Sequence, residues 1–78
     1  MPIYKVFLNP KERARLENKD YRQHPKYIGI KTTMSMYGQY HAITLRKKGD
    51  MLVLLGGFLR FCIVVELRWT NIEVKIYP

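Results

Sequence analysis

Residues 61–77 read FCIVVELRWTNIEVKIY, and this stretch decides the predicted fold. Apolar side chains occupy every second position from 61 to 69 and again from 72 to 76. Alternation of this kind is typical of half-buried strands, because successive side chains of a strand point to opposite faces. The sequence therefore predicts two strands joined by a two-residue loop at Thr70-Asn71, which form a β-hairpin over residues 61–77.

Charged residues in this stretch support the same strand register. In the predicted hairpin, Arg68 lies opposite Glu73, and Glu66 lies opposite Lys75. Each cross-strand pair of opposite charges contributes about 0.2–1 kcal/mol. A shift by one residue would turn the apolar side chains to the wrong face and separate both pairs.

A further hairpin is predicted over residues 27–46. Its first half is rich in Ile, Thr, Met and Tyr, which favour strands. Gly38-Gln39 fits a tight turn with glycine first, and the returning strand places Tyr40 opposite Tyr37.

Residues 47–57, between the two hairpins, predict a short helix and a glycine cap. Asp50 caps a brief helix over residues 51–55, and Gly56-Gly57 ends it in a left-handed conformation.

Residues 1–26 form a basic strand–helix–loop segment. Residues 3–8 alternate as a short strand. Asn9 is a good N-cap, Pro10 suits the first helical position, and Glu12 completes a capping box, so a helix is expected from there to about residue 18.

Taken together, these elements predict one domain, residues 1–78, of the α+β class and mainly β. It contains two β-hairpins and one or two short helices. A chain of 78 residues buries only about 60% of its unfolded surface, so its own core is marginal. We therefore expect a homodimer or a complex with a protein partner.

The sequence also limits the cofactors and the compartment. The single Cys62 excludes an internal disulfide and fits a small hydrophobic role in a reducing, cytoplasmic environment. No Cys/His cluster is present, so no metal or cofactor is expected. The apolar run 51–65 carries Arg60 and is shorter than the roughly 20 residues of a membrane span, so no membrane association is expected.

The net charge of +8 favours a polyanionic partner, most simply RNA or DNA. Arg46-Lys47-Lys48 lies between a predicted strand and a predicted helix, where flexible cations and free helix N–H groups face phosphates together. The front segment would extend this surface. The predicted nucleic-acid-binding residues are Arg46, Lys47, Lys48, Lys11, Arg13, Arg15, Arg22 and Lys26.

Tyrosines interleave with these cations, and two roles for them are open. They are Tyr21, Tyr27, Tyr37 and Tyr40. Exposed rings would stack unpaired bases, whereas packing on the sheet would bury them.

His41 is the weak candidate for catalysis. Together with Arg46 it could serve a metal-independent endoribonuclease through general acid–base catalysis and charge stabilisation. No Asp or Glu lies near His41 in the sequence to orient it, and no acid pair supports two-metal chemistry. The residues favour binding over cleavage.

The second half of the chain resembles a known family. Ile43-Thr44-Leu45, the run Gly49-Asp50-Met51-Leu52 and the C-terminal Val74–Pro78 are similar to motifs of the SymE-like toxins, which are related to the AbrB/MazE swapped-hairpin domains. Residues 63, 65 and 67 fall on the family's Val-x-Val-x-Val positions. The resemblance implies a swapped-hairpin barrel, dimeric through interleaved hairpins, in a cytoplasmic protein that binds nucleic acid and acts as a toxin or regulator.

Three functions therefore remain open. The first is a dimeric nucleic-acid-binding protein of the SymE/AbrB type. The second is an endoribonuclease toxin that uses His41. The third is a small inhibitor or subunit, encoded by a phage or mobile element, that docks onto a larger protein complex through an apolar face or sheet edge.

Overall fold

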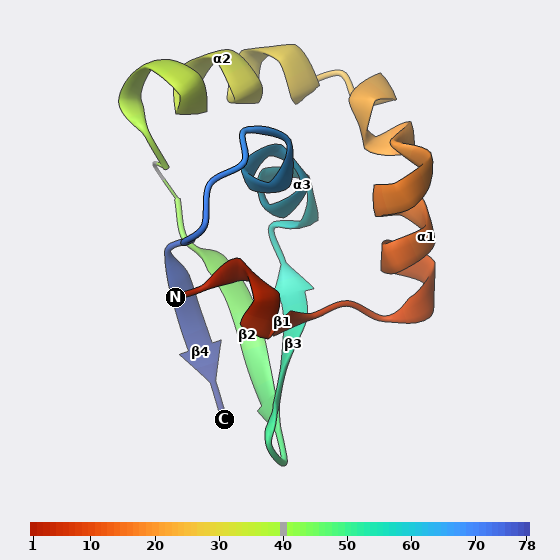
Figure 1. The fold of residues 1–78 in the computed structure, drawn as a ribbon, viewed down its shortest axis with the longest axis vertical. Helices are drawn as coiled ribbons and strands as arrows, with labels where there is room; N and C mark the ends of the chain where they lie inside the picture. Colours follow the sequence, from red (N-terminus) through yellow and green to blue (C-terminus); the bar gives the residue numbers. More distant parts are fainter. Residues whose placement is uncertain (40) are drawn as a thin grey trace.

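A four-stranded mixed sheet and three α-helices form the fold of this protein (Figure 1). The computed structural model describes residues 1–39 and 41–78. The strands are β1 (Val6–Phe7), β2 (Ile43–Lys48), β3 (Met51–Gly56) and β4 (Val74–Tyr77). The helices are α1 (Pro10–Asn18), α2 (Tyr27–Tyr37) and α3 (Phe58–Glu66), with two 3₁₀ turns, η1 (Ile3–Lys5) and η2 (Asp20–Gln23).

The sheet has the strand order β1-β3-β2-β4. Strands β2 and β3 form an antiparallel hairpin, joined at Gly49-Asp50. Gly49 has a φ of 59°, which glycine adopts without steric cost. The outer strands are both parallel to their neighbours, β1 to β3 and β4 to β2.

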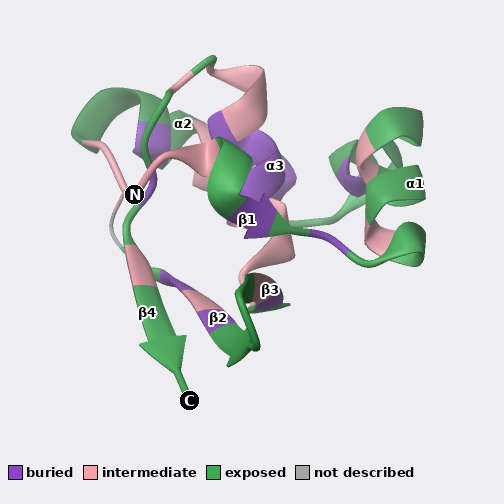
Figure 2. Cartoon of the chain, turned by 60° about the horizontal axis from the view of Figure 1, so that its bottom comes forward, coloured by how far each residue is buried: buried purple, intermediate pink, exposed green. Residues whose placement is uncertain are grey.

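Helix α3 lies in the middle of the molecule, with α2 above it, α1 to one side and the strands below in the view of Figure 1. The largest fully buried side chains belong to this helix and to β2; they are Ile43, Leu45, Cys62, Ile63 and Val64. Figure 2 shows the same division, with burial concentrated on α3 and on the inner part of the sheet. The core therefore lies between one sheet face and the central helix.

The predicted helix in the front segment is confirmed. The Asn9 side-chain oxygen accepts a hydrogen bond from the Glu12 backbone N–H at 2.8 Å, and Pro10 occupies the first turn. The predicted strand over residues 3–8 is mostly wrong, because only Val6–Phe7 pairs with the sheet and Ile3–Lys5 forms a 3₁₀ turn.

The predicted hairpin over residues 27–46 is wrong in its first half, since Tyr27–Tyr37 is helix α2. Tyr27, Ile30 and Met34 recur at helical spacing and pack in or against the core. Burial of this stripe outweighs the strand preference of the individual residues. Gly38 caps the helix and does not begin a hairpin turn. Tyr40 lies outside the described residues.

The predicted hairpin over residues 61–77 is also wrong, because Phe58–Glu66 is helix α3. The positions between the apolar residues, 62 and 64, are themselves apolar, so the run is continuous. Continuous apolar runs do not distinguish a buried strand from a buried helix. Only Val74–Tyr77 forms a strand there, and it pairs in parallel with β2. Glu66 bonds to Arg22, so the predicted pairing of Glu66 with Lys75 fails with the hairpin.

The predicted helix over residues 51–55 is wrong as well. Met51–Gly56 is strand β3, which returns against β2 after a two-residue turn. A run of five apolar residues next to such a turn suits a strand better than a helix. Gly56-Gly57 precedes a helix instead of ending one. The α+β class is confirmed, with more helix than predicted.

A close approach explains the second glycine of this pair. Gly57 has a φ of 87°, and a Cβ there would lie 2.8 Å from Ile43 Cγ2 and 3.2 Å from the Ile43 Cα. Because the second contact is with backbone, no side-chain movement relieves it. The chain turns sharply from β3 into α3 against β2, and only glycine fits.

We expect Gly57→Ala to lower the free energy of unfolding by about 1–3 kcal/mol, because alanine is strained at this φ and collides with Ile43. Urea denaturation followed by circular dichroism measures the loss. The control is Gly29→Ala in α2, where an added Cβ meets nothing within 4 Å and the helix gains up to about 1 kcal/mol. Equal stability of the two variants would contradict the close approach.

Candidate functional site

The predicted nucleic-acid-binding cations are divided between the end of β2 and the part of the molecule formed by α1, η2 and the start of α2 (Figure 1). Arg46, Lys47 and Lys48 occupy the end of β2 next to the hairpin turn. Lys11, Arg13 and Arg15 lie on α1. Arg22 is in η2, and Lys26 is the N-cap residue of α2. The structure therefore does not join the eight residues into one surface.

Two of these cations are engaged in the fold. The Arg15 guanidinium lies 4.7 Å from the centroid of the Phe58 ring and its Nε lies 3.5 Å from Asp20 Oδ1. Arg22 donates from Nε to the Glu66 carboxylate at 2.6 Å. These contacts hold α1 and η2 against α3.

The tyrosines divide between core and surface. Tyr21 and Tyr27 are buried, with ring centroids 5.9 Å apart, and burial raises the pKa of Tyr21 to about 12. These two rings pack inside the protein and do not offer a face to a base. Tyr37 is exposed.

Cys62 is fully buried, and burial raises the pKa of its thiol to about 12. The expectation of a small hydrophobic role is confirmed, since a thiol held in its neutral form is a poor nucleophile.

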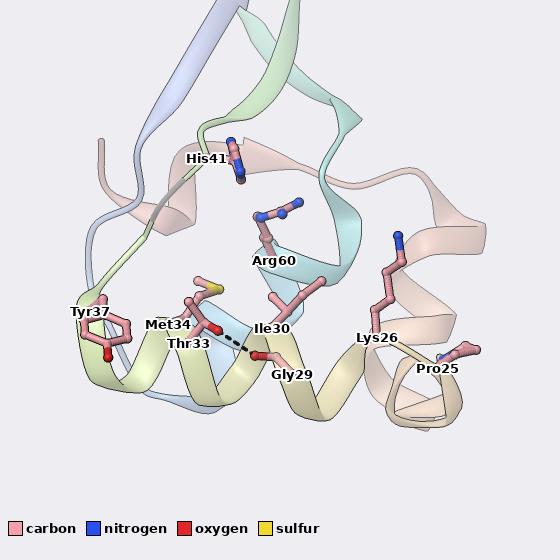
Figure 3. Close-up of a pocket in the computed structure, with 9 residues that line it drawn as sticks. All are labelled: Pro25, Lys26, Gly29, Ile30, Thr33, Met34, Tyr37, His41 and Arg60. Atoms are coloured by element: carbon pink, nitrogen blue, oxygen red, sulfur yellow. Dashed lines mark hydrogen bonds between the residues drawn. The ribbon is translucent and has the colours of Figure 1, made fainter.

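A cavity of about 660 Å³ lies between α2 and the start of α3, and we call it the α2–α3 cavity. Its α2 wall is one stripe of that helix at helical spacing: Lys26, Gly29, Ile30, Thr33, Met34 and Tyr37. Pro25, His41 and Arg60 complete the lining (Figure 3). The stripe joins a cationic end at Lys26 to apolar and aromatic side chains further along the helix.

Helix α3 brings a positive charge to this cavity through Arg60. Gly57 is its N-cap and has no side chain to accept from the first N–H groups, and the first turn contains no acidic residue. Such an end carries a partial positive charge and suits an anion. Arg60 lies in that first turn and adds a full positive charge where the helix dipole disfavours one.

His41 and Lys26 bring two more nitrogen groups to the cavity. Figure 3 shows the His41 and Arg60 side chains near each other, with Lys26 at the start of α2. The Thr33 hydroxyl donates to the Gly29 carbonyl at 2.9 Å within the same wall. His41 thus shares a cavity with Arg60, whereas Arg46, its predicted partner, lies further along β2.

Arg60 is the site residue that the sequence analysis missed. It lies between the predicted glycine cap at 47–57 and the predicted hairpin at 61–77, so it was assigned to no element, although a glycine pair followed by a helix with arginine in its first turn is a signal for anion binding. The stripe on α2 was missed because residues 27–37 were predicted as a strand, in which helical spacing has no meaning.

Glu66 connects the helices that enclose the α2–α3 cavity. At the last turn of α3 it accepts hydrogen bonds from Arg22 Nε and the Tyr27 hydroxyl, both at 2.6 Å. Lys31 Nζ lies 3.8 Å from the same carboxylate. Burial alone raises the pKa of Glu66, but the hydrogen bonds from Tyr27 and Arg22 outweigh it, and the pKa lies below its ordinary value.

Comparisons with known proteins identify a similar fold but assign the chain to no family. No protein-family model and no curated protein matches the chain. Among solved structures, the chain is similar to sulfiredoxin from Arabidopsis thaliana, with a TM-score of 0.75 and 17% identity. The alignment covers 99% of this chain and 80% of that one. At this identity the likeness shows a shared α+β fold.

Within the part of the chain that the structure describes, no helix combines the length and the apolar character that crossing a bilayer requires.

We expect Glu66→Gln to remove a pH-dependent part of the stability. Because the pKa of Glu66 is lowered in the folded protein, its contribution is present above the ordinary value of 4.5 and is lost as the pH falls through the lowered pKa. At neutral pH the variant should lose about 1.5–3 kcal/mol, the range for hydrogen bonds to charged groups. Urea denaturation at about pH 7 and about pH 3 measures both effects.

The control for this experiment is Glu73→Gln, at an exposed carboxylate. The stability difference between wild type and Glu66→Gln should shrink at the lower pH, while the Glu73 variant should follow the wild type at both. A Glu66 difference that stays constant with pH would contradict the assignment.

Proposed function

We propose that this chain binds a phosphorylated ligand of nucleotide size in the α2–α3 cavity. The observation that carries the proposal is Arg60 in the first turn of α3, lining one cavity with Lys26 and His41. Each of the three side chains suits a phosphate oxygen.

The size and the lining of the cavity support the same ligand class. Sites for small molecules and cofactors are usually about 300–1,000 Å³, and about 660 Å³ falls within this range. Ile30, Met34 and Tyr37 supply an apolar and aromatic wall for the non-phosphate part, such as a base. The described residues of the lining include no carboxylate, so nothing there repels an anion.

We infer binding and not turnover. His41 is a nitrogen base that lines the same cavity as Arg60. The endoribonuclease hypothesis therefore stays a proposal, in which Arg60 takes the place of Arg46 as the cation next to His41. Lys26 and Arg60 account for phosphate binding without any chemical step at His41.

A nucleic-acid-binding role is the second candidate. The exposure of Arg46, Lys47 and Lys48 at the end of β2 favours it, together with the net charge of +8. Four further expectations stay predictions from the sequence. They are the SymE-like relationship with its toxin or regulator role, the homodimer, the docking inhibitor and the cytoplasmic location.

Isothermal titration calorimetry with adenosine 5′-monophosphate tests the cavity, with adenosine and inorganic phosphate as partial ligands. We expect Arg60→Gln to weaken binding of the monophosphate about 10- to 100-fold, because a charge-assisted hydrogen bond contributes about 1.5–3 kcal/mol. Adenosine, which lacks the phosphate, should bind weakly to both proteins.

The matched control is Arg46→Gln, which removes the same charge at the end of β2 away from the cavity. Its affinity for the monophosphate should stay within about twofold of the wild type. Equal losses in the two arginine variants, or no binding by the wild type, would contradict the proposal.

A further inference from the structure

One face of the sheet is left open by the helices. In β2, Ile43 and Leu45 point into the core, and the alternate residues Thr44, Arg46 and Lys48 point to the opposite face. Figure 2 shows the end of β2 and most of β4 as exposed. We call this opposite face the open face.

The strand register aligns one row of side chains across the open face. Phe7 pairs with Val53, Val53 with Arg46, and Arg46 with Tyr77, so the row crosses all four strands. Strands lie about 4.8 Å apart, which makes the row roughly 14 Å long. Phe7 is 41% exposed and Tyr77 is 45% exposed. An aromatic ring thus lies at each end of the row and a guanidinium lies between them.

The charges of the open face are of one sign. Lys48 and Lys75 join Arg46 on it, Lys75 by its pairing with Thr44. No residue of the four strands, as the structure describes them, is acidic. Cations next to exposed aromatic rings are the combination that binds single-stranded nucleic acid, through phosphate contacts and base stacking.

A second copy of this chain is a poor occupant for the same face. A two-fold interface places the same patch of both copies together, so Arg46, Lys48 and Lys75 would face their own equivalents. Like charges brought together across an interface cost several kcal/mol. A polyanion instead gains from each of these groups.

We propose that the open face binds single-stranded nucleic acid, with bases stacked on Phe7 and Tyr77 and phosphates held by Arg46, Lys48 and Lys75. Open four-stranded sheets with aromatic residues stack about two or three bases in this way. The proposal rests on the second candidate function and does not depend on the α2–α3 cavity. Of the three predicted cations of β2, the proposal includes Arg46 and Lys48 and excludes Lys47, because Lys47 points to the other side of the sheet.

Fluorescence anisotropy of labelled oligo(dT) and oligo(U), each about 10 nucleotides long, tests the proposal and separates DNA from RNA. We expect Tyr77→Ala to weaken binding about 5- to 150-fold, which corresponds to the roughly 1–3 kcal/mol of one stacked base. Tyr77→Phe, which keeps the ring, should bind as the wild type does. Neither change alters the charge, so general electrostatic attraction does not explain such a loss.

Arg46→Gln and Lys47→Gln form the second, matched pair on opposite faces of one strand. Arg46→Gln should weaken binding by more than about fivefold and reduce the slope of log K against log salt by about 1. Lys47→Gln should change affinity by less than about twofold.

Several results would overturn the proposal. Equal losses of oligonucleotide affinity in the Arg46 and Lys47 variants, with no loss in Tyr77→Ala, would mean general attraction to the basic surface. The second candidate function would then hold without the open-face site. Duplex DNA bound as tightly as the single strands would exclude stacking. A dimer in light scattering that Phe7→Ala or Tyr77→Ala dissociates would assign the open face to a second copy. No oligonucleotide binding at low salt would reject this proposal and the second candidate function together.

Discussion

The contact between Gly57 and Ile43 is the constraint on which the rest of this structure depends. Because of this contact, the chain turns at the C-terminal end of β3 and passes directly over β2, so that α3 lies in the centre of the fold. A helix that buries four consecutive residues, Phe61–Val64, is stable only when other elements surround it. The sheet, α1 and α2 supply that enclosure, and the first turn of α3 is left at the wall of the cavity.

The two ends of α3 carry charges opposite to those that a helix dipole favours. A cation, Arg60, lies in the first turn and an anion, Glu66, is the last helical residue. At the C-terminal end the cost is offset within the protein, because Arg22 and Lys31 surround the Glu66 carboxylate. At the N-terminal end, the proposed phosphate would provide the same kind of compensation for Arg60. The same helix thus links the internal ion pairs to the proposed ligand site.

The sequence predicted what is local and missed what depends on burial. The Asn9 cap of α1 was correct because it involves residues only three apart. The strand prediction for residues 61–69 was wrong because a helix that is buried on all sides has no polar face to mark its helical period. A continuous apolar run then fits an alternating strand pattern equally well. The parallel pairing of β4 with β2 joins residues 31 apart, such as Ile43 and Val74, and no turn in the sequence marks it.

The site was predictable to the same limited extent. Lys26 and His41 were among the candidates, but Arg60 was not, because its role depends on α3 being a helix whose first turn reaches the cavity. Arg46 and Lys48 share a face and Lys47 does not, a division that follows only from the strand register.

Amide chemical shifts from ¹H–¹⁵N NMR during titration with adenosine 5′-monophosphate test the central claim most directly. The account predicts that the largest changes fall on residues 57–60, at the start of α3, and on the α2 stripe from Lys26 to Tyr37. Changes confined to the strands, or spread evenly over the exposed cations, would contradict it.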